Sequence, residues 1–137
     1  MYRLREKLMF VEVKGFGRKK NAELGDFAYR VLSALEVTEG EVTIIGSKSV
    51  DGEMGGFCGT DTDYDDIIIE IAKEDFTDEE LRCHLAHELV HAKQYIKQEL
   101  SEDGRLWYGK EYNVPYYELP WEKEAYSKEK VLATTCA

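Results

Sequence analysis

Basic residues, cysteines and long apolar runs are all scarce in this sequence, and each scarcity excludes a class of protein. The 137 residues include 18 Lys and Arg against 28 Asp and Glu, which gives a net charge of −10. Because proteins bind the nucleic-acid backbone through clustered Lys and Arg, this balance argues against a nucleic-acid partner. The one basic cluster, Arg18-Lys19-Lys20, is short and typical of a solvated turn.

Only three cysteines occur, at Cys58, Cys83 and Cys136. Their number is odd and no CxxC pair is present, so the sequence indicates neither a disulfide framework nor a thiolate zinc site. This usage fits a reducing cytoplasm. No stretch approaches the ~18 apolar residues of a membrane span, and the amino-terminal residues lack the apolar run of a signal peptide. We therefore expect a cytoplasmic protein with no membrane partner.

The length suits a single domain over residues 1–137. Apolar residues alternate or cluster as in strands at some places and recur at helical spacing at others. We expect strands at 1–14, 41–46, 53–60 and 66–72, and helices at 22–36, 78–99 and 120–132. Residues 18–21 are expected to form a loop, and residues 101–119 form a long connection rich in aromatic side chains.

The expected helix at 78–99 has a clear start. Thr77 is followed three residues later by Glu80, which is the pattern of a capping box. Apolar residues then recur at helical spacing and predict one buried stripe. The stripe consists of Leu81, Leu85, Leu89, Ala92 and Ile96.

All three histidines of the chain lie in this helix, at His84, His87 and His91. His87 and His91 are four residues apart and project from one face, so their imidazoles can reach one tetrahedral Zn²⁺. Glu88, beside the first ligand, is then placed to act as general base for a water that the metal activates. We interpret His84 as a supporting or surface residue and Cys83 as a core residue.

A catalytic zinc usually has three protein ligands and one open position. No histidine follows His91, so the third ligand is expected to be a carboxylate, and the helix at 120–132 offers Glu122 and Glu124. Ala125 lies on the same helical face as Glu122 and is small enough for a close approach to the zinc helix. Glu124 instead shares a face with Lys128, as in an exposed ion pair. This pattern favours Glu122 over Glu124.

An HExxH helix followed by a helix with a glutamate resembles the gluzincin arrangement of thermolysin-like peptidases. The string Glu-x-Glu-Ala-Tyr at 122–126 resembles the ExxAD string of HtpX-type and CAAX prenyl peptidases and the ExEAN string of the ImmA/IrrE group. The resemblance implies that Glu122 is the third ligand. It also implies a zincin-like α+β fold, in which a small, mostly antiparallel sheet packs on the two zinc-bearing helices. Tyr126 stands where these families often have Asp or Asn, and we expect it to support a zinc-bound imidazole.

The function expected from these features is that of a zinc endopeptidase acting on a peptide or protein substrate. An edge strand, either 53–60 or 66–72, is expected to pair with the extended substrate. One tyrosine among Tyr108, Tyr112, Tyr116 and Tyr117 is a candidate donor to the oxyanion. The alternative is a non-catalytic, zinc-stabilised binding or regulatory protein on a peptidase-like scaffold. Glu88 favours catalysis, because a purely structural site needs no general base.

Overall fold

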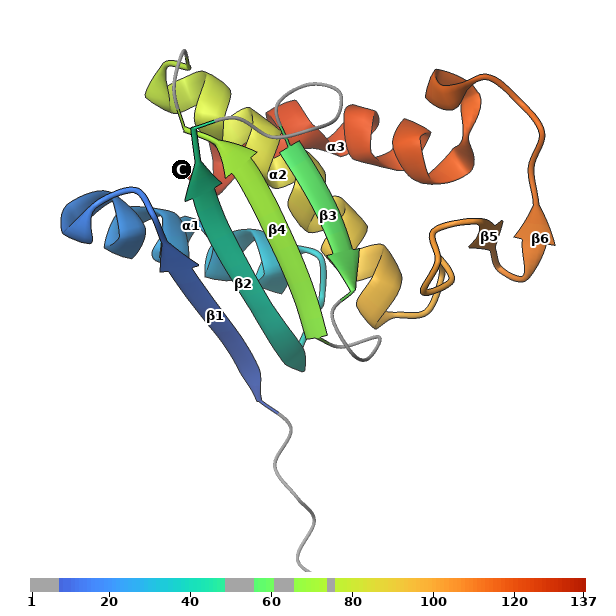
Figure 1. Ribbon diagram of the computed structural model, residues 1–137, viewed down its shortest axis with the longest axis horizontal. Helices are drawn as coiled ribbons and strands as arrows, with labels where there is room; N and C mark the ends of the chain where they lie inside the picture. Colours follow the sequence, from blue (N-terminus) through green and yellow to red (C-terminus); the bar gives the residue numbers. More distant parts are fainter. Residues whose placement is uncertain (1–7, 49–55, 61–65, 74–75) are drawn as a thin grey trace, which may run out of the picture.

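The computed structural model describes residues 8–48, 56–60, 66–73 and 76–137. Its main sheet has the strand order β1-β2-β4-β3 (Figure 1). The strands are β1 Met9–Lys14, β2 Gly40–Ser47, β3 Gly56–Thr60 and β4 Asp66–Ala72. The expected strands at 1–14 and 53–60 begin at residues outside the described part, and the strand expected at 66–72 is confirmed.

The sheet is mixed rather than mostly antiparallel. β1 pairs with β2 and β2 pairs with β4 in parallel, and only β3 runs antiparallel to its neighbour β4. The helix α1, Arg18–Ala34, connects β1 to β2. A helical crossover returns the chain to the end of the sheet where it started, so the two strands it joins run parallel. The expected α+β class is confirmed, but the expected strand direction is wrong.

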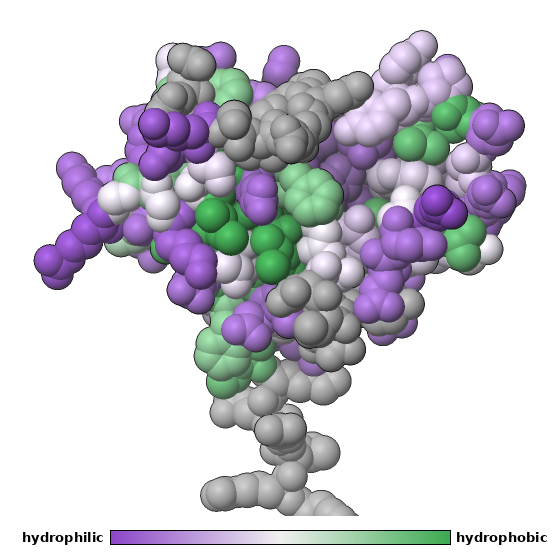
Figure 2. Space-filling model, viewed as in Figure 1, coloured by the Kyte–Doolittle hydropathy of each residue, from purple (hydrophilic) through white to green (hydrophobic). Residues whose placement is uncertain are grey.

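Helices cover one face of the sheet (Figure 1). α1 and α2 (Asp78–Ile96) lie against the sheet, and α3 (Pro120–Thr135) packs on α2. Every second residue of the central strands faces them: Val42, Ile44, Ile67, Ile69 and Ile71 are all fully buried. On the opposite face, hydrophobic side chains gather at the centre of the sheet and hydrophilic ones surround them (Figure 2). Because these buried side chains face the helices, the core lies between the sheet and the helices, and α2 sits within it.

Residues 18–21, expected to be a loop, form the first turn of α1 instead. The amide oxygen Oδ1 of Asn21, in the first turn of the helix, accepts a hydrogen bond from the backbone N–H of Phe16 at 3.0 Å. This contact ties the residues before the helix to its first turn. The polar side chains of this turn need no core contact. Lys20 binds Asp78, the first residue of α2, at 2.7 Å. The helix therefore extends beyond its apolar stripe.

The start of α2 is confirmed in detail. The hydroxyl of Thr77 accepts from the backbone N–H of Glu80 at 3.2 Å, and the Glu80 carboxylate accepts from the backbone N–H of Thr77 at 2.9 Å. The helix ends at Ile96, because Gln98 takes a left-handed conformation with φ of 56°. α3 begins at Pro120 as expected and runs on to Thr135. Within the described residues, no helix is long and apolar enough to cross a membrane.

The connection between α2 and α3 is partly ordered into small elements. A hairpin of β5, Leu106–Trp107, and β6, Lys110–Glu111, lies away from the main sheet (Figure 1). Tyr108 and Gly109 form its tip with φ of 50° and 78°, the positive values that a two-residue hairpin turn requires. A short 3-10 helix, η2 Tyr116–Glu118, then leads into α3.

Candidate metal centre

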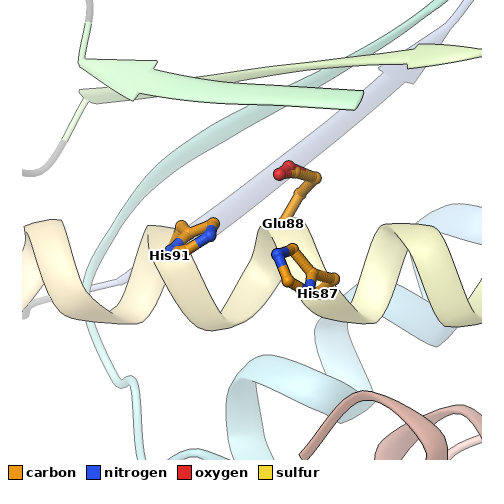
Figure 3. Close-up of side chains that lie close together, drawn as sticks. All are labelled: His87, Glu88 and His91. Atoms are coloured by element: carbon orange, nitrogen blue, oxygen red, sulfur yellow. The ribbon is translucent and has the colours of Figure 1, made fainter. Parts of the chain in front are cut away.

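The three residues of the helical motif lie on one face of α2 and are buried. His87, Glu88 and His91 are 9%, 7% and 7% exposed. One ligand atom from each lies within 4.8 Å of the others, so the three side chains form a group that could hold a metal ion. Glu88 points from the helix toward the sheet, while the two imidazoles lie one turn apart (Figure 3). The helical spacing thus produces the convergence that the sequence predicted.

Glu122 of α3 reaches the same point. Its Oε1 atom lies 3.1 Å from Nε2 of His87 and 3.1 Å from Nε2 of His91. Ala125, three residues later, is fully buried, and its small side chain allows α3 to pack closely on α2. The structure therefore brings together all four residues that the sequence singled out.

The donor set fits a zinc ion. Two imidazole nitrogens and one carboxylate oxygen are a common set for catalytic zinc. Zinc–nitrogen and zinc–oxygen bonds of about 2.0–2.2 Å place tetrahedral ligands roughly 3.3–3.4 Å apart. The 3.1 Å separations in this centre are close to that value. Burial acts to raise the pKa of Glu122, but its hydrogen bonds with His87 and His91 outweigh burial and hold the pKa at about 2. Glu122 is therefore ionised at neutral pH.

Glu88 differs from Glu122 in its surroundings. Burial raises the pKa of Glu88, and the nearby His91 and His87 only partly oppose this effect. Its Oε2 atom is buried and accepts no hydrogen bond from any described residue. A carboxylate with a raised pKa and a free oxygen beside a metal-ligand set is suited to accept a proton.

A carboxylate that the sequence analysis missed lies behind His87. Oε2 of Glu129 is 3.6 Å from Nδ1 of His87, the ring nitrogen that faces away from Glu122. Tyr126, which we expected to support an imidazole, packs its ring edge against that of His87, with centroids 4.6 Å apart. Glu129 follows Glu122 by seven residues, or two helical turns. That spacing on one face of α3 was the signal that would have identified it.

Gln94 is a second missed residue. Its Oε1 atom lies 2.8 Å from Nδ1 of His91, three residues earlier on α2. Glu124 binds Lys128 at 2.7 Å, as expected, but it does not point away from the centre. Its carboxylate also binds Lys93 at 2.8 Å and Gln94 at 2.9 Å, both on α2. The expectation that Glu124 faces solvent is therefore wrong, because α2 supplies two more donors on that side.

The remaining candidates lie outside the ligand group. His84 stacks on Phe76, with ring centroids 4.4 Å apart. Burial raises the pKa of Cys83 to about 11, and the charge of Glu129 adds to this effect. Neither residue belongs to the group of ligand atoms around His87 and His91. The ring contact of His84 is with Phe76 and not with a candidate ligand, and Cys83 is only partly buried rather than a core residue.

A cavity of about 210 Å³ opens onto the centre between β3, α2 and the start of α3. Its walls include Cys58 and Tyr116 as well as Glu88, His91 and Glu122. Burial raises the pKa of Tyr116, and the charge of Glu122 raises it further. Burial likewise raises the pKa of Cys58, so its thiol stays protonated at neutral pH. Both side chains therefore face the centre as neutral groups.

A larger groove of about 530 Å³ lies elsewhere, between the end of α1 and the later turns of α3. Leu35, Lys97 and Val131 are among its lining residues, and none of the candidate ligands is. We assign the site to the smaller cavity, because that is where a buried, unpartnered carboxylate oxygen and convergent ligand atoms occur together.

Comparison of the chain with models of protein families, with curated proteins and with solved structures found no match. The interpretation of the centre therefore depends on its geometry and chemistry.

Proposed function

We propose that this chain is a zinc-dependent endopeptidase of the gluzincin type. The observation that carries the proposal is the convergence of Nε2 of His87 and Nε2 of His91 on one oxygen of Glu122, with Glu88 beside them in the same cavity. His87, His91 and Glu122 would hold the ion. Zinc bound there supplies Lewis acidity that lowers the pKa of a water to near neutrality.

Glu88 is the proposed general base. Its Oε2 atom has no hydrogen bond from the described residues, and its raised pKa makes it a stronger proton acceptor than an exposed carboxylate. A zinc site that served only to stabilise a binding protein would gain nothing from a buried carboxylate with an unpaired oxygen. This observation favours catalysis over the non-catalytic alternative.

Tyr116 is the proposed donor to the oxyanion. Of the four tyrosines considered from the sequence, it is the one that lines the cavity. Its hydroxyl interacts with Glu122, and its raised pKa keeps the proton on the oxygen. A neutral O–H that lines the cavity can stabilise negative charge that develops on a carbonyl oxygen.

β3 is the proposed substrate-binding strand. β4 is paired on both sides, whereas β3 is the last strand of the sheet and, among the described residues, has a partner on one side only. A β-carbon at Gly56 would lie only 3.2 Å from Cγ of Glu88, so the strand passes close to the general base. An extended peptide that pairs with this edge would therefore run beside Glu88.

The test compares wild type with Glu88→Gln, using elemental analysis and cleavage of an unfolded protein substrate. Wild type should contain one zinc per chain and cleave the substrate. Glu88→Gln should keep zinc and lose cleavage by about 10²–10⁴-fold. Glu79→Gln, an exposed change in the first turn of the same helix, is the matched control and should cleave normally. Equal cleavage by Glu88→Gln and wild type, or wild type without zinc, would contradict the proposal.

A further inference from the structure

Gln94 is fully buried, although an amide side chain is costly to bury unless its polar atoms are satisfied. Here each polar atom has a partner. The Oε1 atom lies 2.8 Å from Nδ1 of His91. The Nε2 group donates to the carbonyl oxygen of Trp121 at 2.9 Å and to Oε1 of Glu124 at 2.9 Å. The side chain therefore bridges the histidine on α2 to the first turns of α3.

The chemistry of these partners fixes the orientation of the amide. The backbone carbonyl of Trp121 can only accept hydrogen bonds. The carboxylate of Glu124 accepts from the ammonium groups of Lys93 and Lys128, so its oxygens act as acceptors here. Two acceptors require the NH₂ group of Gln94 to face them, so its oxygen must face His91. A flipped amide would place oxygen against oxygen at both contacts.

This orientation determines which nitrogen of His91 carries a proton. A carbonyl oxygen cannot donate, so Nδ1 of His91 must donate to Gln94. When the ring is neutral, Nε2 keeps its lone pair and faces the candidate metal position; without metal, a proton on Nε2 makes the 3.1 Å hydrogen bond to Oε1 of Glu122. Gln94, on the far side of the ring, thus favours the tautomer of His91 that can bind metal through Nε2.

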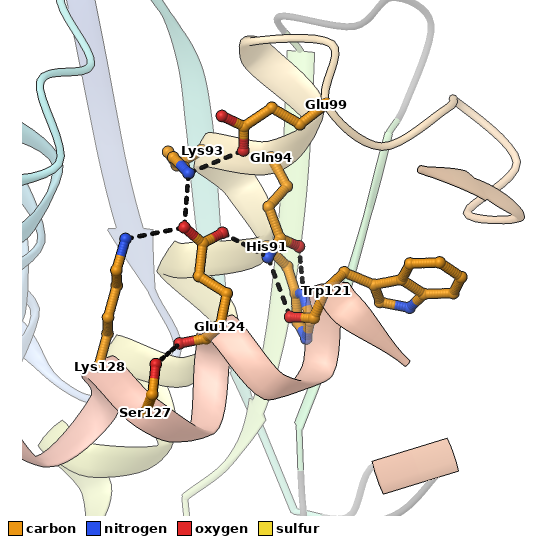
Figure 4. Close-up of polar contacts among 8 residues, drawn as sticks. All are labelled: His91, Lys93, Gln94, Glu99, Trp121, Glu124, Ser127 and Lys128. Atoms are coloured by element: carbon orange, nitrogen blue, oxygen red, sulfur yellow. Dashed lines mark hydrogen bonds and ion pairs between the residues drawn. The ribbon is translucent and has the colours of Figure 1, made fainter. Parts of the chain in front are cut away.

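Glu124, which accepts from Gln94, also forms ion pairs with two lysines. Oε2 of Glu124 accepts from Lys93 at 2.8 Å and from Lys128 at 2.7 Å (Figure 4). Lys93 also binds Glu99 at 2.7 Å. The cluster joins α2 to α3 on the side of Gln94 away from His91, so the amide has little freedom to rotate.

We propose that Gln94 is a positioning residue of the metal centre: it fixes the ring and the tautomer of His91, and Trp121 and Glu124 fix Gln94 in turn. This inference rests on the proposed function in one respect, that His91 is a metal ligand. It assigns Gln94 no contact with the metal or the substrate.

The experiment measures zinc affinity by chelator competition, with the melting temperature of each metal-free variant as a separate readout of folding. Gln94→Met has a similar shape but cannot accept a hydrogen bond from His91, and we expect it to bind zinc about 10–100-fold more weakly. The double variant Gln94→Glu with Glu124→Gln keeps an acceptor for Nδ1, although its second oxygen meets the carbonyl of Trp121, and should bind zinc more tightly than Gln94→Met. Glu99→Gln is the control, because the Glu99 side chain binds Lys93 of the same cluster and makes no hydrogen bond with the side chain of Gln94.

The absorption spectrum of the cobalt-substituted protein gives a further readout of ligand geometry. Gln94→Met should change this spectrum, whereas Glu99→Gln should match wild type. Gln94→Met with the affinity and the spectrum of wild type would overturn the positioning role while leaving the metal site in place. An equal loss of affinity in Glu99→Gln would also overturn it, because the effect would then be general destabilisation. Absence of zinc binding by wild type would overturn the proposed function as well.

Discussion

The carboxylate of Glu129 lies 3.6 Å from Nδ1 of His87, behind the ring whose other nitrogen faces Glu122. This distance is longer than a hydrogen bond, so the contact is electrostatic. A carboxylate behind a metal-bound imidazole orients the ring and raises its basicity. Glu129→Gln should therefore weaken zinc affinity about 10-fold, measured by chelator competition. Glu23→Gln, an exposed change on α1, is the control, and equal affinities in the two variants would exclude this role.

The two glutamates at the start of α3 should differ in what they affect. Glu122→Gln removes the oxygen charge that faces both imidazoles and should lower zinc affinity by at least 10²-fold. Glu124→Gln can still accept from Gln94 and should keep the affinity within about 3-fold, while lowering the melting temperature through weaker bonds to Lys93 and Lys128. The reverse order of affinities would show that Glu124 is the ligand.

Tyr116→Phe should lower turnover by about 10²-fold without loss of zinc, because it removes one donor to the oxyanion. Tyr117→Phe is the matched control. Tyr117 is the next residue along the chain, is 67% exposed and does not line the cavity. Single-turnover cleavage rates at saturating substrate separate this effect from weaker binding. Equal rates for the two variants would remove Tyr116 from the mechanism.

Stability should respond to pH in opposite directions with and without metal. Burial acts to lower the pKa of His91, but its contacts with Glu122 outweigh burial and raise it. In the metal-free protein, the protonated His91 therefore stabilises the fold. This contribution is fully present below the ordinary histidine pKa of about 6.5 and is lost as the pH rises through the raised pKa of His91. With zinc bound, protons compete for the same imidazoles, so stability rises with pH instead.

The measurement is the melting temperature between about pH 6 and pH 8, with zinc and with a chelator, for wild type and His91→Gln. The contribution of His91, taken as the difference between the two proteins, should fall with pH in chelator and rise with pH in zinc. Below about pH 4.5 the metal-free protein should also lose stability as Glu122, whose pKa is about 2, becomes protonated. The same trend with pH under both conditions would contradict the ligand assignment.

Thr77→Ala should destabilise the metal-free protein by about 1 kcal/mol, because it removes the hydroxyl that accepts from the backbone N–H of Glu80. The melting temperature should fall by a few degrees. Thr134→Ala is the control: its hydroxyl binds a carbonyl within α3 and caps no helix start. Equal decreases in melting temperature for the two variants would show that the capping box does not stabilise the protein.

Local signals in the sequence predicted the starts of α2 and α3 and the candidate ligands on them. The Thr77–Glu80 capping box and the first-turn proline at Pro120 each act within a few residues, so the starts of α2 and α3 could be predicted. The spacing of His87 and His91 fixes their relative position on any helix. Glu122 could be chosen over Glu124 because Ala125 marks the face of α3 that approaches α2.

Features that depend on distant residues could not be predicted in the same way. The direction of β2 relative to β1 follows from the crossover through α1, a signal present in the strand–helix–strand order but outweighed by the family resemblance. Gln94 carries no sign of its role until α3 brings the carbonyl of Trp121 and the carboxylate of Glu124 against it. Glu129 shares a face of α3 with Glu122, but its contact with His87 also depends on how α3 packs on α2.

The β5–β6 hairpin between α2 and α3 contributes none of the metal-facing atoms, although Trp107 of β5 lies against Trp121 at the wall of the cavity, with ring centroids 6.3 Å apart. Its tip, at Tyr108 and Gly109, is exposed. Doubling the length of such a loop costs only about 0.6 kcal/mol in closure entropy. Insertions at the tip would thus be tolerated while the helices hold the ligands in register. In the proposed peptidase, substrate preference can therefore diverge at the rim of the cavity while the residues at its floor stay the same.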